Sequence, residues 1–212
     1  MEKLAAMARS HQPRLLIVDR TVGGRFENYR TPEQQIPDKP LPYAWETCMT
    51  MGDSWSFKPN DKYKSTHRLI QILVDVVGKG GNFLLNVGPQ PDGQLPAAAL
   101  ARMREIGQWL DINGEAIYGT RPIAPYKEGD VVFTRKGKSV YAIVVPRNEG
   151  EAVAEKIVLK SMKPIGDVTL LGSAEKLKWS AEGDGVVITL PSAVRTIPQG
   201  RYGITLHWES RS

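Results

Sequence analysis

The stretch STHRLIQILVDVVGKGGNFLLNVG, residues 65–88, decides the fold class, because a helical hydrophobic period passes directly into a short apolar run. The period predicts a helix that is capped by Ser65 or Thr66 and ended by the glycines after Val77. One face of this helix is expected to carry Leu69, Leu73, Val76 and Val77. The run over residues 82–88 predicts a buried strand. A helix that feeds a buried strand is the repeating unit of an α/β fold.

The alternation of strands and helices extends to both sides of this stretch. A helix over residues 3–9 leads into an apolar run over 14–21, which predicts a buried parallel strand, and residues 43–51 alternate as a second strand does. An irregular, proline-rich loop over 21–41 separates the two strands. Residues 95–114 predict a further helix with an inward face made of Leu100, Met103, Gly107 and Leu110. This order is typical of a βα-repeat domain.

The hydrophobic pattern of the sequence changes after a proline-containing linker near residues 120–127. Short alternating runs separated by turn residues follow, with Lys136-Gly137-Lys138 and Gly183-Asp184-Gly185 placed where hairpin turns are needed. This pattern predicts an antiparallel β domain. We therefore expect an α/β domain over residues 1–122 and an all-β domain over 123–212.

Composition narrows the classes of function. The chain has 212 residues, 41% of them hydrophobic, and a net charge of +5 from basic residues that are scattered rather than clustered, which does not favour nucleic-acid binding. One cysteine, Cys48, excludes an internal disulfide and a paired-cysteine metal site. We expect no membrane span, because no run of about eighteen apolar residues occurs. The opening residues lack the features of a signal peptide.

Polar residues follow three of the expected strands, where parallel α/β folds place their active residues. Asp19 and Arg20 follow the first strand, and Glu46 in the second leads toward Trp55. Asn86, Gly88 and Asp92 follow the third, and Glu33 lies in the proline-rich loop. A guanidinium, carboxylates and an exposed tryptophan suit a sugar site, since forked groups bind hydroxyls and an aromatic face covers C–H patches. Paired carboxylates of this kind support glycoside hydrolysis.

Each of these residues also has a purely structural interpretation. Glu33 can be a solvated charge or a pin for its loop, Trp45 and Trp55 can be packing residues, and Asp19 can pair with Arg20. The three histidines, His11, His67 and His207, are too far apart in sequence to indicate a metal site. The glycines of GKGGN lead into a strand, whereas a phosphate-binding loop opens a helix. The residues alone leave these alternatives open.

Three longer motifs resemble a known family. WETCMTMGDSWSF, LVDVVGKGGNFLLNVGPQPDGQLP and IGQWLDINGEAIYGTRP resemble the carboxyl-terminal part of the catalytic domain of family 29 glycoside hydrolases, the α-L-fucosidases. The resemblance covers roughly residues 10–123, and the later β segment is similar to that family's carboxyl-terminal β-sandwich. It implies a partial (β/α)8-like barrel followed by a sandwich, a retaining exo-glycosidase with an aspartate nucleophile and a separate acid/base, and no metal or organic cofactor.

The resemblance also implies roles for single residues. Arg20, in VDR, matches the arginine that contacts fucose. Glu33, in TPE, matches the general acid/base, with Glu46, in WE, as a supporting residue and the fallback for that role. Trp55, or alternatively Phe57, matches the aromatic residue that packs on the sugar ring and its methyl group.

No segment of this sequence matches the family's nucleophile or the histidines of its sugar pocket. The resemblance places them upstream, so we expect the chain to need an amino-terminal barrel segment, either from the same gene or from a split partner. The substrate implied is a fucosylated glycan or glycoside. A non-catalytic carbohydrate-binding or scaffolding protein is the main alternative, and a basic nucleic-acid-binding module is the third. A homo-oligomer and a periplasmic or secreted location, if an upstream segment carries a signal, stay open.

Overall fold

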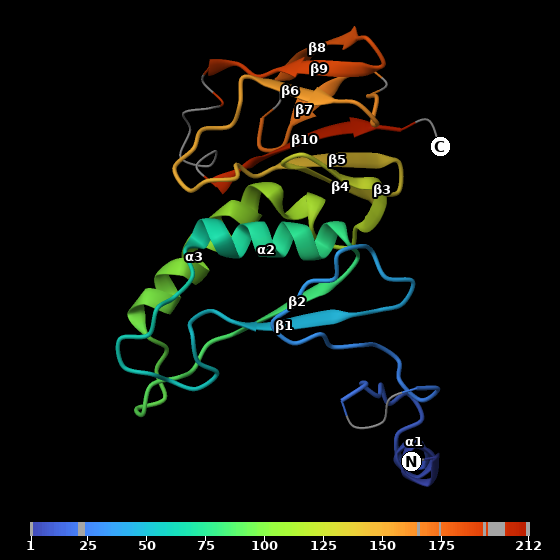
Figure 1. Cartoon of the computed structure of the whole chain (residues 1–212), viewed down its shortest axis with the longest axis vertical. Helices are drawn as coiled ribbons and strands as arrows, with labels where there is room; N and C mark the ends of the chain where they lie inside the picture. The colour runs from blue at the N-terminus through green and yellow to red at the C-terminus, as the bar shows by residue number, and fades with distance from the viewer. Residues whose placement is uncertain are drawn as a thin grey trace.

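The computed structural model describes residues 2–20, 24–164, 166–173, 175–192, 194 and 202–210. Two parts follow one another along the chain (Figure 1). The first contains helices α1 (Glu2–His11), α2 (Thr66–Gly78) and α3 (Ala97–Asn113) and the parallel strands β1 (Glu46–Thr50) and β2 (Asn82–Asn86). The second is an antiparallel β-sandwich. The predicted order of an α/β part and an all-β part is confirmed.

The two parallel strands are joined by α2, as the period of residues 65–88 predicts. Cys48 of β1 pairs with Leu84 of β2 in the middle of the register. The side chain of Ser65 caps α2 by accepting from the amide of Arg68 at 3.2 Å. Gly80 follows the helix with a φ of +80°, a conformation that glycine adopts without strain.

Two further segments extend this parallel arrangement beyond β1 without forming full strands. Isolated parallel bridges join Val18 to Tyr29, Arg30 to Trp45, and Glu33 to Cys48. The order in space is therefore residues 17–18, residues 29–33, β1 and β2, which we call the parallel array. Its outermost backbone bond runs from the amide of Asn28 to the carbonyl of Ile17 at 2.7 Å.

This arrangement corrects two expectations. Residues 14–21 do not form the predicted strand, since one bridge, at Val18, is the only pairing in the described part of that run. Conversely, residues 29–33 belong to the array although the sequence predicts loop throughout 21–41. Pro32 has no amide hydrogen, so a continuous ladder cannot form there and only separate bridges remain.

Helix α2 is buried on two sides, which the single predicted face does not anticipate. On one side Ile72 and Val76 pack with Trp45 and Met49 of the β1 segment. On the other side Ile70 and Val74 belong to a core cluster shared with the β-sandwich: Trp109, Ala116, Ile117, Val132, Tyr141, Ile143, Val145 and Tyr202. Leu73 and Val77 are only partly buried against this second cluster. The helix is the layer between the array and the sandwich (Figure 1).

The predicted inward face of α3 is partly wrong. Met103 is 45% exposed, whereas Trp109, with an exposed fraction of 2%, is the large buried side chain. Strand β2 also differs from the expectation of a buried strand, since Leu84 is 51% exposed. Leu84 lies on the face of the array opposite α2, because its neighbours Phe83 and Leu85 pack in the clusters that contain residues of α2.

The β-sandwich is built from one hydrogen-bonded sheet of eight strands, which folds over an apolar core. The order is β3-β4-β5-β10-β7-β8-β9-β6, and its inner faces share one apolar cluster that includes Phe133, Leu159, Ile188 and Leu206. Both predicted hairpin turns are confirmed, with φ of 60° at Gly137 and 57° at Gly183. The strands are β3 (Arg121–Glu128), β4 (Val131–Lys136), β5 (Ser139–Val144), β6 (Lys156–Leu159), β7 (Val168–Leu170), β8 (Lys176–Glu182), β9 (Gly185–Thr189) and β10 (Ile204–Glu209).

Buried hydrogen bonds join the sandwich to the helices. Asn113 at the end of α3 accepts from the hydroxyl of Thr205 on β10 at 2.8 Å, and the indole of Trp109 donates to the carbonyl of Gly203 at 3.2 Å. Because buried polar groups are costly unless they are paired, these bonds fix how the two parts sit on one another. The division into domains at residue 122 stays a prediction.

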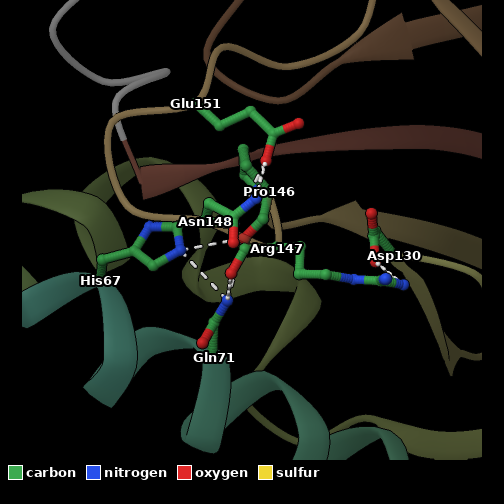
Figure 2. Close-up of polar contacts among 7 residues, drawn as sticks. All are labelled: His67, Gln71, Asp130, Pro146, Arg147, Asn148 and Glu151. Atoms are coloured by element: carbon green, nitrogen blue, oxygen red, sulfur yellow. Dashed lines mark hydrogen bonds and ion pairs between the residues drawn. The ribbon is translucent and has the colours of Figure 1, made fainter.

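A second set of bonds ties α2 to the segment after β5 (Figure 2). His67 Nε2 lies 2.9 Å from the carbonyl oxygen of Pro146 and must donate to it, because a carbonyl only accepts. The amide of Gln71 donates to the carbonyls of Pro146 and Arg147 at 2.9 and 3.0 Å. His67 therefore has a structural role, as the sequence left open.

Tyr141 of β5 lies at the same joint between helices and sandwich. Its exposed fraction is 1%, its ring stacks on that of His207 with centroids 5.3 Å apart, and its hydroxyl donates to Glu115 Oε1 at 2.6 Å. Burial and the bond to Glu115 raise the pKa of Tyr141 to about 12.

We expect the free energy of unfolding to fall as the pH rises from about 10 toward 12, because tyrosine in an unfolded chain ionises near pH 10. The stabilisation from the neutral phenol is complete below that pH and is lost as the pH rises through the folded-state value of about 12. Urea unfolding of the wild type and of Tyr141→Phe across this range measures the effect, and the variant should show a smaller fall. Glu115→Gln should shift the tyrosinate absorbance transition to lower pH. Equal falls in wild type and Tyr141→Phe would contradict this account.

Candidate active site

The open face of the parallel array carries a pocket of about 500 Å³. Side chains in an extended segment alternate between the two faces, so every second residue points to the same side. Glu46 and Cys48 of β1 line the pocket, whereas Trp45 and Met49 pack against α2. The pocket is lined by Val18, Arg20, Tyr29, Thr31, Glu33, Glu46, Cys48, Trp55 and Leu84.

The alternation of side chains along an extended segment explains why the proline-rich segment contributes three residues to the pocket. Tyr29, Thr31 and Glu33 are spaced by two residues and all line the pocket. The bridges of Tyr29 and Glu33 to the flanking segments hold this stretch extended. The sequence motifs predict a role for Glu33 but none for Thr31, because the segment is predicted to be a loop, in which spacing carries no information about side-chain direction. The period of two was the signal that could have found it.

Arg20 is the centre of the polar contacts in the pocket. Its Nη1 lies 2.7 Å from Glu33 Oε2, its Nε donates to Thr31 Oγ1 at 2.9 Å, and its Nη2 donates to Cys48 Sγ at 2.9 Å. The hydrogen bond with Glu33 is the main cause that raises the pKa of Arg20, and the electrostatic interaction with Cys48 adds to it. The sequence places Arg20 and Glu33 thirteen residues apart, and the fold brings them into contact.

Asp19 does not pair with Arg20, which was one of the open interpretations. Its Oδ1 instead accepts from the amide of Thr31 at 3.1 Å and from the hydroxyl of Thr31 at 2.9 Å. The carboxylate of Asp19 thus holds the neighbouring segment rather than the guanidinium.

Glu46 differs from Glu33 in its partners. Its backbone amide donates to the carbonyl of Arg30 at 2.9 Å, but within the described part of the chain its carboxylate has no hydrogen bond or ion pair. The pocket therefore holds one carboxylate that is paired with a cation and one that is free to meet a ligand.

The two candidate aromatic residues are placed differently. Trp55 lines the pocket and is 41% exposed, so its indole is available to a ligand. Phe57 does not line the pocket. Its backbone packs closely against Gly88, where an added Cβ would come within 2.3 Å of the Phe57 amide nitrogen.

The other strand-end residues are not brought into the pocket. Asn86 ends β2, and its Oδ1 is buried without a partner in the described part of the chain. Asp92 accepts from the amide of Gln94 at 3.0 Å in the next turn. The described residues contain no group of three histidine, cysteine, aspartate or glutamate side chains that could hold a metal ion.

A family model described as "Alpha-L-fucosidase" matches residues 1–115, and one described as "Alpha-L-fucosidase C-terminal domain" matches residues 126–209. The chain belongs to the α-L-fucosidase family. The resemblance seen in the sequence motifs is therefore confirmed.

Individual members of the α-L-fucosidase family agree with this assignment. An α-L-fucosidase of Branchiostoma floridae is 38% identical over 160 residues, which cover 71% of this chain and 35% of that protein. The structure of α-L-fucosidase isoenzyme 1 from Paenibacillus thiaminolyticus superposes with a TM-score of 0.87 at 27% identity and covers 99% of this chain and 53% of that one. The α-fucosidase of Thermotoga maritima, in complex with a mechanism-based inhibitor, gives a TM-score of 0.81 at 30% identity and covers 99% and 48%.

The matches cover most of this chain but only part of each relative. The chain spans about a third of the length of the curated α-L-fucosidases that it matches and about half of the solved ones. Among the described residues, no helix is long and apolar enough to cross a membrane.

Proposed function

We propose that this chain supplies the carboxyl-terminal part of a retaining, exo-acting α-L-fucosidase, which hydrolyses terminal α-L-fucosyl linkages of glycans or glycosides. The observation that carries the proposal is the single pocket in which Arg20, Glu33, Glu46 and Trp55 meet, in a chain of the α-L-fucosidase family. Membership of the family alone would not suffice, since a fold hosts many functions and the site must support the chemistry. The Thermotoga maritima relative in complex with fucose adds support for the sugar.

In this proposal Glu33 is the general acid/base. It protonates the departing oxygen and then activates water against the glycosyl-enzyme ester. Glu46 supports or orients the substrate, Arg20 binds sugar hydroxyls, and Trp55 covers the apolar side of the ring. Phe57 is the weaker choice for that last role because it does not line the pocket. The proposal requires no metal or organic cofactor.

The ion pair between Arg20 and Glu33 gives a reason for coupling binding to catalysis. A carboxyl group that donates a proton carries no charge for a guanidinium to pair with, so the ion pair no longer exists once Glu33 is protonated to act as an acid. Sugar hydroxyls that accept from Arg20 would open it. The acid would then become available only when substrate is present.

The nucleophilic aspartate is proposed to lie in an amino-terminal barrel segment. A retaining mechanism needs a second carboxylate about 5 Å from the acid/base, on the opposite side of the anomeric carbon. In the described pocket Glu46 is the only other carboxylate, and it has the supporting role, so this chain alone is proposed to be inactive. The exposed face of β2 around Leu84 is where such a segment would pack.

The function is tested by expressing residues 1–212 alone and together with the amino-terminal half of a barrel as a second polypeptide. We expect hydrolysis of an aryl α-L-fucoside only when both are present. Activity of residues 1–212 alone would contradict the upstream nucleophile. No activity in either case would favour the non-catalytic carbohydrate-binding role, and binding of fucose by calorimetry would then identify it.

Substitution of the two glutamates in the complete enzyme separates their roles. Glu33→Gln should lower kcat by about 10²–10⁴-fold for substrates with poor leaving groups, since it removes general acid catalysis. External azide should restore turnover of activated aryl fucosides, because azide attacks the glycosyl-enzyme without a base. Glu46→Gln should show no azide rescue. The reverse pattern would assign the acid/base to Glu46.

Arg20→Ala should mainly weaken substrate binding in the complete enzyme. Loss of charge-assisted hydrogen bonds to a substrate is expected to raise KM about tenfold or more. Arg25→Ala is the matched control, because Arg25 is an exposed arginine that pairs with Glu2 outside the pocket. If KM and kcat of Arg20→Ala both equal those of the wild type, Arg20 does not belong to the site.

A further inference from the structure

Thr31 is a polar residue of the pocket to which the proposed mechanism gives no task. Its hydroxyl lies 2.9 Å from Arg20 Nε and 2.9 Å from Asp19 Oδ1. A hydroxyl has one hydrogen to donate, and the Nε of arginine can only donate. The directions of both bonds therefore follow: Arg20 donates to Thr31, and Thr31 donates to Asp19.

Asp19 orients the hydroxyl of Thr31 and also fixes its position. The same Oδ1 accepts from the backbone amide of Thr31 at 3.1 Å. The lone pair that remains on Thr31 Oγ1 then points at Arg20. Asp19 Oδ1 is the acceptor at the end of this chain of bonds.

The far end of the chain of bonds is the Arg20–Glu33 pair. The Arg20 side chain is 45% exposed, and a long exposed side chain would sample many rotamers without tethers. The bond at Nε sets the plane of the guanidinium, and with that plane fixed Nη1 meets Glu33 and Nη2 meets Cys48. A planar guanidinium held at one nitrogen leaves little freedom to the other two.

We propose that Thr31, held by Asp19, is a positioning residue that sets the orientation of the Arg20 guanidinium, the group proposed to bind the sugar hydroxyls. This inference rests on the proposed function. Thr31 is not assigned a contact with the substrate. Its effect on the reaction must therefore disappear when Arg20 is absent, which a direct contact or a general loss of stability would not do.

The test is a double-mutant cycle in the complete enzyme with an aryl α-L-fucoside. Thr31→Val keeps the shape of the side chain and its backbone bond to Asp19 but removes the acceptor. We expect kcat/KM to fall about tenfold, as for loss of one hydrogen bond to a charged group, with the same division between KM and kcat as in Arg20→Ala. Thr31→Ser should recover most of the activity. In the Arg20→Ala background, Thr31→Val should change kcat/KM by less than about twofold.

Thr134→Val is the control for loss of a threonine hydroxyl elsewhere. Thr134 Oγ1 donates to the carbonyl of Ala116 at 2.8 Å in the buried joint below the sandwich. This variant should lower the unfolding midpoint without changing KM or kcat. An equal loss of kcat/KM in Thr31→Val with and without Arg20 would overturn the proposal, as would wild-type values for Thr31→Val. If Thr31→Val does not fold, Thr31→Ala takes its place in the cycle.

A second readout does not depend on catalysis. In the ¹⁵N-labelled chain the Nε–H signal of Arg20 is assigned by its absence in Arg20→Ala. We expect its exchange with water to be slow in the wild type and in Thr31→Ser, and several-fold faster in Thr31→Val. If the complete wild-type enzyme lacks fucosidase activity, the proposed function fails while this measurement still decides whether Thr31 holds Arg20. Unchanged exchange in Thr31→Val would refute the inference whatever the activity.

Discussion

The two-sided burial of α2 is the constraint on which the rest of the structure depends. Ile72 and Val76 complete the core beneath the parallel array, and Ile70 and Val74 complete the core beneath the sandwich. A helix buried on both sides cannot shift toward one layer without opening the other, since interiors are close-packed. Gly78 at its end allows the contact with β4 to be close, because an added Cβ would meet Val132 Cγ1 at 2.2 Å. The positions of β1 and β2 follow from that of α2, because Met49 and Phe83 share the core of Ile72 and Val76.

The pocket is a consequence of strand alternation on the opposite face of the array. Once Trp45 and Met49 point to α2, residues 46 and 48, which alternate with them, must point away from it. Glu46 and Cys48 therefore face the pocket, and the bridges at Arg30 and Glu33 carry the same alternation into the next segment. The polar groups converge because their backbones are in register, although Arg20 and Cys48 are distant in sequence.

Much of this could be predicted from the sequence, for reasons that can be named. The helical period of residues 66–78, the glycines after it and the hairpin turns at Gly137 and Gly183 are local signals, and the structure confirms them. The pairing of residues 29–33 was not predicted, because Pro32 masks the period of two that places Tyr29, Thr31 and Glu33 on one face. The second buried side of α2 and the burial of Trp109 also escaped prediction, since both depend on the sandwich packing from outside. Arg20, Glu33, Glu46 and Trp55 were assigned by motif, whereas the bonds of Thr31 to Arg20 and Asp19 are visible only in the structure.

The joint between helices and sandwich determines which piece of this protein could be exchanged between relatives. Trp109, Asn113 and Thr205 form one buried set of hydrogen bonds, and Ile70 and Val74 share their core with β4 and β5. Cutting the chain after α3 would expose that core on both products. The sandwich is therefore not an interchangeable module, with or without these helices, because α2 also shares a core with the parallel array. A chimaera that grafts the sandwich alone would have to redesign a complete interior surface, and one that also carries α2 and α3 would have to rebuild the core that Ile72 and Val76 share with Trp45 and Met49.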